Sequence, residues 1–112
     1  SMSKVFYDKY LVFEEIEIEL GKLNLEKEER QEIEVLIDEM IHHRMMDKIL
    51  SHLPREHHEE FLDKFHKIPY DESLLQYLDE RIETSVEQHI KDEMQKLKKE
   101  ILEDIKTSCS PK

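Results

Sequence analysis

The sequence contains little glycine, proline or cysteine. Its 112 residues include one Gly, three Pro, one Cys and no Trp. So little turn-forming material favours a few long elements, and the abundance of Lys, Glu, Leu and Met favours helices over strands. The single cysteine, Cys109, excludes a disulfide framework within these residues. We therefore expect a reducing, cytoplasmic location.

Long apolar runs are absent as well. No stretch approaches the ~20 consecutive apolar residues that a membrane-spanning helix requires. The start of the chain does not resemble a signal peptide, so we expect no association with a membrane. Apolar residues make up 38% of the chain and charged residues 40%, which predicts a thin core. The length predicts one domain over residues 1–112, with frayed ends at 1–3 and 107–112.

Positive charge is scarce relative to negative charge. The chain has 17 basic and 28 acidic side chains and a net charge of −11. Between Glu14 and Glu39, eleven carboxylates face three cations, so this stretch alone carries −8. Such a balance disfavours direct binding of nucleic acid or anionic lipid. A basic protein partner, or solubility alone, remains as the explanation of the acidity.

The stretch from Glu26 to Leu53 has the clearest helical pattern. Its apolar side chains recur at steps of three and four, at Ile33, Leu36, Ile37, Met40, Ile41, Met45, Ile49 and Leu53. The side expected to face water carries Glu28, Glu32, Asp38, Glu39, His42 and Asp47. This spacing predicts an amphipathic helix whose apolar stripe needs another element to cover it.

The segment before this helix has an ambiguous pattern. Its apolar residues fit one helical face, yet Ile16 and Ile18 alternate with Glu, as in a strand. We expect a helix over Lys4 to Leu20, because no second strand-like segment is present to pair with it. Gly21 is expected to end that helix in the left-handed conformation, and Asn24 to cap the next helix.

Two prolines divide the second half of the chain. Pro54 is expected to end the central helix, and Pro69 lies in a break between a short helix over Arg55 to Lys67 and a helix-prone stretch over Glu72 to Lys106. The apolar residues of that last stretch mostly recur every four positions, and each step turns the stripe by a further ~40°. In one straight helix the stripe would end on the side opposite to where it began. We therefore expect this stretch either to wrap around its neighbours or to break into two helices. A capping-box pattern favours a break near Glu83 to Ser85.

These patterns together predict an all-α fold. We expect a small bundle of four to five helices, with one long central helix and a long C-terminal helix that carries a kink or break. The core should consist of the apolar stripes of these helices, which cover one another.

Several short motifs follow one another along the chain. They are Leu20-Gly21, residues 44–50, Glu59-Glu60-Phe61-Leu62, residues 77–82, Ile90-Lys91-Asp92-Glu93 and Lys96-Leu97-Lys98-Lys99-Glu100. Over residues 19–100 the chain resembles a family of short, acidic, all-helical proteins of unknown function that is widespread in candidate-phyla bacteria. The resemblance implies an α-helical cytoplasmic protein and supplies no activity. That family usually has a proline after the position of Ile82, where this chain has Glu83.

Histidines beside carboxylates are the candidates for a metal site. Glu39 and His42, and likewise Asp63 and His66, have the i, i+3 spacing with which di-iron bundles place two ligands on one helix face. However, His42 falls on the polar side of its helix, and the other helices offer Leu and Ile where inward carboxylates would be required. We therefore expect solvated histidines, with no metal and no cofactor. Clustered histidines could alternatively sense pH.

No pattern indicates catalysis, because Cys109 has no His nearby in sequence and no Gly-rich phosphate loop is present. We expect a non-enzymatic domain that binds a protein partner or itself, with a homodimer favoured. The interface candidates are aromatic residues of the N-terminal segment and a methionine beside the core stripe, namely Phe6, Tyr7, Tyr10, Phe13 and Met46. One alternative is an acidic decoy for a basic nucleic-acid-binding protein, and a less favoured one is a His/carboxylate metal site.

Overall fold

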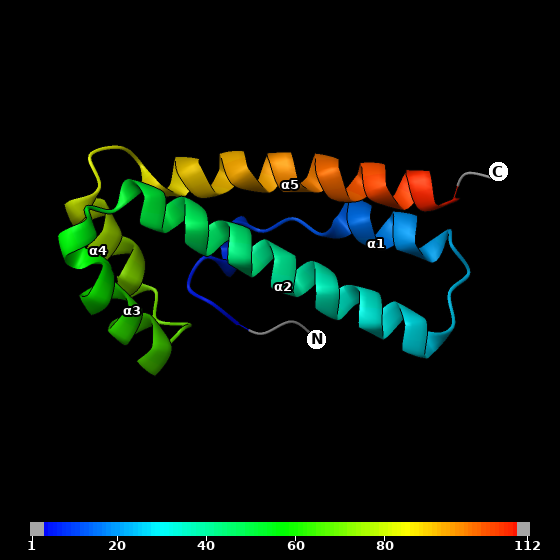
Figure 1. Ribbon diagram of the computed structural model, residues 1–112, viewed down its shortest axis with the longest axis horizontal. Helices are drawn as coiled ribbons and strands as arrows, with labels where there is room; N and C mark the ends of the chain where they lie inside the picture. Colours follow the sequence, from blue (N-terminus) through cyan, green and yellow to red (C-terminus); the bar gives the residue numbers. More distant parts are fainter. Residues whose placement is uncertain (1–3, 110–112) are drawn as a thin grey trace.

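The computed structural model describes residues 4–109, which form helices and no strand (Figure 1). Five α-helices and two short 3₁₀-helices follow in the order η1 (Asp8–Tyr10), α1 (Glu14–Gly21), α2 (Lys27–His52), η2 (Arg55–His57), α3 (His58–Lys67), α4 (Ser73–Arg81) and α5 (Val86–Cys109). The expected all-α bundle with a long central helix is confirmed. The expected frayed residues 107–109 belong to α5, whereas 1–3 and 110–112 lie outside the described residues.

The bundle is elongated, with dimensions of 49 × 24 × 20 Å. Its radius of gyration is 15.9 Å, against about 13 Å for a compact domain of this length. Helices α2 and α5 run along the long axis and pack on each other, and α1 packs on α5. Helices α3 and α4 form the left end in Figure 1. The other end is formed only by α1, the start of α2 and the end of α5.

Two stripes of aliphatic side chains form the core between the long helices. Helix α2 contributes Ile37, Ile41, Met45 and Ile49. Helix α5 contributes Val86, Ile90, Met94, Leu97, Ile101 and Ile105. Both stripes advance in steps mainly of four, so each stripe turns slowly around its helix. The two helices therefore pack with their axes inclined to each other rather than parallel.

The break expected in the C-terminal stretch is confirmed. Helix α4 ends at Arg81 and α5 begins at Val86. The backbone N–H of Gln88 donates to Oγ of Ser85 at 3.2 Å, and that of Val86 donates to Oδ1 of Asp79 at 3.2 Å. These side chains satisfy donors that the start of a helix leaves free, so the break is a capped helix start.

The expected helix over Lys4 to Leu20 is wrong in its first half. Residues before Glu14 form only the 3₁₀ turn η1 and irregular backbone. The consecutive side chains of Phe6 and Tyr7 are 2% and 0% exposed, and the Phe6 N–H donates to the carbonyl of Pro69 at 2.8 Å. A helix would carry successive residues around its axis by 100° each, whereas the irregular backbone lets both rings enter the core.

The turn between α1 and α2 also differs from the expectation. Gly21 remains inside α1, and Asn24 has the positive φ of 54°. Asparagine tolerates the left-handed region better than other non-glycine residues, so it serves the turn. The N-cap of α2 is Glu26, in a capping box with Glu29. Asn24 therefore shapes the turn and does not cap the helix.

Candidate interaction groove

The first turns of α2 diverge from α5 at one end of the bundle (Figure 1). An open groove lies at this end. Its volume is about 610 Å³. It is lined by Leu20, Lys22, Leu23, Leu25, Ile33, Ile37, Met40, Ile101, Asp104 and Ile105. These residues come from the end of α1, the α1–α2 turn, α2 and α5. The lining is mainly aliphatic, so the groove suits apolar side chains.

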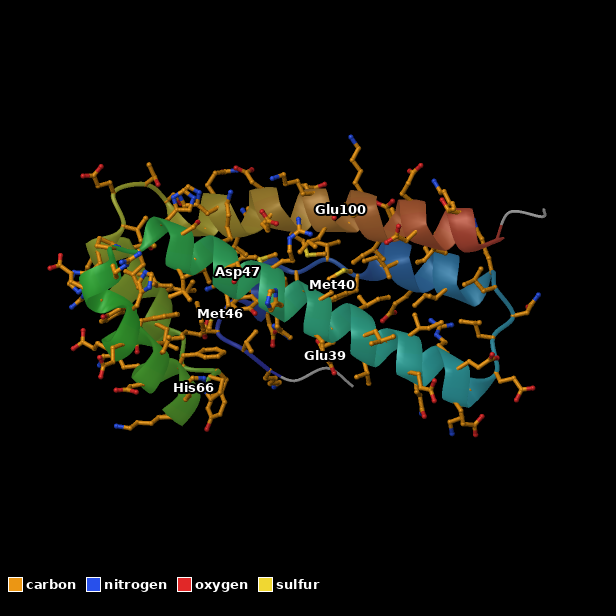
Figure 2. The ribbon with its side chains drawn as sticks, viewed as in Figure 1. Glu39, Met40, Met46, Asp47, His66 and Glu100 are labelled. Carbon is orange, nitrogen blue, oxygen red and sulfur yellow. The ribbon has the colours of Figure 1, made fainter. Side chains whose placement is uncertain are left out.

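The groove has a buried floor and partly open walls. Leu20, Ile37, Ile101 and Ile105 form the floor, with exposures of 8% or less. The walls are formed by side chains that remain half-buried, at Leu23, Leu25, Ile33 and Met40. Figure 2 shows Met40 on the side of α2 that faces α5, and Glu39 on a different side that points away from the bundle. No element of the described chain fills the space above the floor.

The apolar surface of α2 continues outward from the groove. Leu36 is 64% exposed and Val35 is 56% exposed. They line a second, shallow hollow of about 540 Å³ together with Glu28, Gln31 and Glu32. The expectation that Leu36 belongs to a covered stripe is therefore wrong. No helix of the described part of the chain covers this side of the first turns of α2.

Polar contacts hold the walls of the groove in place. The guanidinium of Arg30 donates to the carbonyl of Glu17 at 3.3 Å and lies 3.6 Å from the carboxylate of Glu34. This side chain therefore ties α2 to α1. Lys98, whose side chain is 19% exposed, pairs with Glu15 at 3.0 Å and ties α5 to α1. The groove is thus bounded by three helices that are connected to one another.

A charged cluster lies farther along the contact between α2 and α5. Arg44 donates to Glu100 through two nitrogens at 3.1 and 2.9 Å, and it also lies 3.0 Å from Glu93. Glu93 is only 5% exposed, and Lys48 approaches it at 4.0 Å. The hydrogen bonds to Glu100 raise the pKa of Arg44, and the same bonds lower the pKa of the Glu100 carboxyl. This cluster stabilises the helix pair and lies outside the groove lining.

The interface candidates proposed from sequence lie elsewhere. Phe6 and Tyr7 are buried in an aromatic cluster with Phe61, where Phe6 makes an edge-to-face contact with each ring at 5.0 to 6.1 Å between centroids. Tyr10, Phe13 and Met46 are half-buried and pack against the core. The structure therefore leaves no exposed aromatic surface at Phe6 or Tyr7, and Leu36, the most exposed aliphatic side chain named above, lies on α2.

The four candidate metal ligands do not converge. Glu39 is exposed, and His66 projects from the far end of α3 (Figure 2). Asp63 is exposed as well, and His42 is turned toward the N-terminal segment. Within residues 4–109, no three His, Cys, Asp or Glu side chains are arranged to hold a metal ion.

A polar chain links the N-terminal segment to α2. The hydroxyl of Tyr7 lies 2.5 Å from Nδ1 of His42, and Nε2 of His42 lies 3.1 Å from Oδ1 of Asp38 without the alignment of a hydrogen bond. An Nε2 proton facing the carboxylate leaves Nδ1 as the acceptor for the Tyr7 O–H. Burial raises the pKa of Tyr7, and the charges of Asp8 and Asp38 add to the effect. The expectation that Asp38 and His42 face water is therefore wrong, because Tyr7 covers them.

Two histidines stack where α2 ends and α5 begins. The rings of His52 and His89 lie 3.6 Å apart at 15°, and Thr84 contacts His89 at 2.5 Å. Burial lowers the pKa of His52, and the charges of His89 and Lys48 lower it further. The stacked rings link the end of α2 to the start of α5.

The groove was missed because the sequence signal pointed to aromatic residues. The available signal was the width of the apolar surface between Ile33 and Met40, where Val35 and Leu36 add apolar area beyond one stripe. Contributions from Ile101 and Ile105 could not be found in this way, because they lie in the sequence far from α2.

Comparisons with models of protein families, with curated proteins and with solved structures found no match. The family resemblance noted from the motifs therefore stays a prediction. None of the helices in the described part of the chain is both long enough and apolar enough to cross a membrane.

Proposed function

We propose that this protein is a non-enzymatic interaction module that binds a helix of a partner protein in the groove between α1, α2 and α5. The observation that carries the proposal is the uncovered apolar surface on the first turns of α2, with Leu36 64% exposed. A helix laid in an apolar groove is a common mode of peptide recognition, and it anchors through side chains at i, i+3, i+4 and i+7.

The apolar surface stands out in a chain with so much charge. Charged residues make up 40% of the sequence, yet Leu36 lies exposed beside an aliphatic groove and shares a shallow hollow with the exposed Val35. Contiguous apolar patches rimmed by polar residues mark interaction sites in soluble proteins. Covering a leucine as exposed as Leu36 contributes about 1–2 kcal/mol. The half-buried walls add further apolar area, so a short helix gains enough to bind with moderate affinity.

The acidic decoy is supported less well. Several carboxylates of the acidic stretch pair within the chain, because Glu15 binds Lys98, Glu19 binds Lys22 and Glu34 binds Arg30. Among the remaining carboxylates, Glu28, Glu32 and Glu39 share one side of α2, whereas Glu14 and Glu17 lie on α1. The acidic stretch therefore forms no continuous ridge over its whole length that could imitate a phosphate backbone. A groove-binding module accounts for the apolar surface, which the decoy leaves unexplained.

Selection of binders from a displayed library of random helical peptides tests the proposal. We expect selected peptides to share apolar residues at i, i+3 or i+4, and i+7, and to lose binding to a Leu36→Glu variant. The matched control is Tyr70→Glu, since Tyr70 is also 64% exposed but lies between α3 and α4. Binders that tolerate Leu36→Glu, or that depend on Tyr70, would contradict the proposal.

A further inference from the structure

A row of unpaired carboxylates runs along α2 outside the groove, on the far side of Leu36. Glu28, Glu32 and Glu39 are exposed and follow one another at steps of four and seven, which places them on one side of the helix. No ion pair engages any of the three within residues 4–109. Leu36 lies between this row and the groove wall formed by Ile33 and Met40, because its helical position falls between theirs.

The opposite side of the groove carries one carboxylate. Asp104 lines the groove from α5 and is exposed. The one cation among the lining residues, Lys22, pairs with Glu19 at 3.1 Å, so its charge is compensated. A helix lying in the groove would therefore have the carboxylates of α2 on one flank and Asp104 on the other.

The spacing of these carboxylates indicates how long a helix bound in the groove would be. Glu28 and Glu39 are 11 positions apart on α2, which corresponds to about 16 Å along the helix axis. The apolar wall from Ile33 to Met40 lies within that span. A helix of about three turns covers this distance and can present one apolar side and one charged side.

From these features, and resting on the proposed function, we infer that the groove binds a basic amphipathic helix of a partner protein. The apolar side of that helix covers Leu36 and enters the groove, and its Lys or Arg side chains face Glu28, Glu32 and Glu39. Charge complementarity of this kind selects among partners and speeds association.

A second copy of this chain suits the groove less well. Each copy carries a net charge of −11, and pairing through the α2 surface would bring two rows of unpaired carboxylates close together. Like charges placed opposite each other in an interface oppose association. The chemistry of the groove thus favours a cationic partner over the homodimer expected from the sequence.

Three synthetic peptides of about 16 residues with identical apolar positions test this inference. Their polar positions carry Lys and Arg, Gln only, or Glu only, and their binding to the full chain is measured by fluorescence anisotropy. We expect the basic peptide to bind ~10-fold more tightly than the Gln peptide at low salt, the effect of three exposed ion pairs. Salt at about 300 mM should remove most of this advantage, since it screens exposed charges.

A variant with reversed charge on α2 tests whether its carboxylates select the basic peptide. We expect Glu28→Lys/Glu32→Lys/Glu39→Lys to bind the Glu peptide in preference to the basic one. The matched control, Glu59→Lys/Asp63→Lys/Glu83→Lys, makes the same change of charge at three exposed, unpaired positions outside the groove. It should keep the preference for the basic peptide.

The possible results separate the two proposals. Equal binding of all three peptides, lost in Leu36→Glu, would leave the groove as a binding site and overturn the inference about charge. Failure of all three peptides to bind would overturn both. Sedimentation that shows a dimer of the wild-type chain and a monomer of Leu36→Glu would identify a second copy as the occupant and would also overturn the inference.

Discussion

Removal of Arg44 should destabilise the protein far more than its exposed position suggests. Its side chain is 33% exposed, but it is the closest partner of Glu93, which is 5% exposed. An Arg44→Ala variant leaves that carboxylate buried with only Lys48 nearby, at 4.0 Å. Breaking a buried pair by removing one partner costs about 3–5 kcal/mol. Because Lys48 remains and Arg44 is partly solvated, we expect a loss of about 2–3 kcal/mol.

A matched variant separates the buried pair from the exposed one. Glu100→Ala removes the two hydrogen bonds to Arg44 but leaves the contact with Glu93. The side chain of Glu100 is 51% exposed, so this change should cost less than about 1 kcal/mol. An Arg44→Met/Glu93→Met variant removes both members of the buried pair and should recover most of the stability lost in Arg44→Ala.

Urea unfolding and thermal melting followed by circular dichroism measure these effects. For a chain of this length a loss of 2–3 kcal/mol lowers the melting temperature by roughly 10 °C. Equal losses in Arg44→Ala and Glu100→Ala would refute the reasoning, because they would show that the burial of Glu93 does not set the cost. A double variant less stable than Arg44→Ala would refute it as well.

Three further predictions follow from single contacts. Tyr7→Phe removes the O–H that reaches His42 and should lower the free energy of unfolding by about 1–2 kcal/mol in urea titrations, whereas an unchanged value would show that the contact adds nothing. Asn24 has a positive φ of 54°, so Asn24→Val should lower the free energy of unfolding by about 1–2 kcal/mol, whereas Asn24→Gly should leave it almost unchanged. Equal melting temperatures of the two variants would contradict this. Because folding lowers the pKa of His52 below its ordinary value of 6.5, the unfolded chain binds the proton more readily, so stability should fall as the pH drops through about 6.5. His52→Gln should reduce that slope in melting curves recorded from about pH 5 to 8, and an unchanged slope would assign the effect to other groups.

The long helices and their break could be predicted from local pattern. The stripe in α2 and the four-residue steps before and after Ile82 are properties of neighbouring residues, and a helix obeys them wherever it packs. Pro54 and Ser85 add backbone constraints of the same local kind. Such patterns do not depend on distant residues, and for this reason the sequence alone predicts α2 and the start of α5.

The N-terminal segment could not be predicted in the same way. Phe6 and Tyr7 fit a helix by spacing, but their burial depends on room beside Phe61 and His42. Those partners lie at least 35 positions away in sequence, as the contact of Tyr7 with His42 shows. Tertiary packing therefore overrides the local preference, and it also explains the shielding of Asp38.

The groove could not be predicted from the sequence for a related reason. Periodicity shows that Leu36 and Ile37 both belong to the apolar side of α2, but it does not show which turns another helix covers. In the structure Ile37 is 7% exposed and Leu36 is 64% exposed. The two residues lie 100° apart around α2, so the neighbouring elements that cover Ile37 leave Leu36 open. A side chain can thus have the pattern of a core residue and lie on the surface.

The two ends of the molecule differ in their aromatic contacts. Phe6, Phe61, Phe65 and Tyr77 interlock at the end formed by α3 and α4, with centroids 6.0 to 6.2 Å apart. Among the described residues, no aromatic ring lines the groove at the opposite end, where the lining is mainly aliphatic. Amide hydrogens in the opening turns of α2 should consequently exchange with solvent sooner than those near Phe61. A ligand bound in the groove would slow the exchange of these amide hydrogens. Hydrogen exchange would therefore detect binding at this end of the molecule without a fluorescent label.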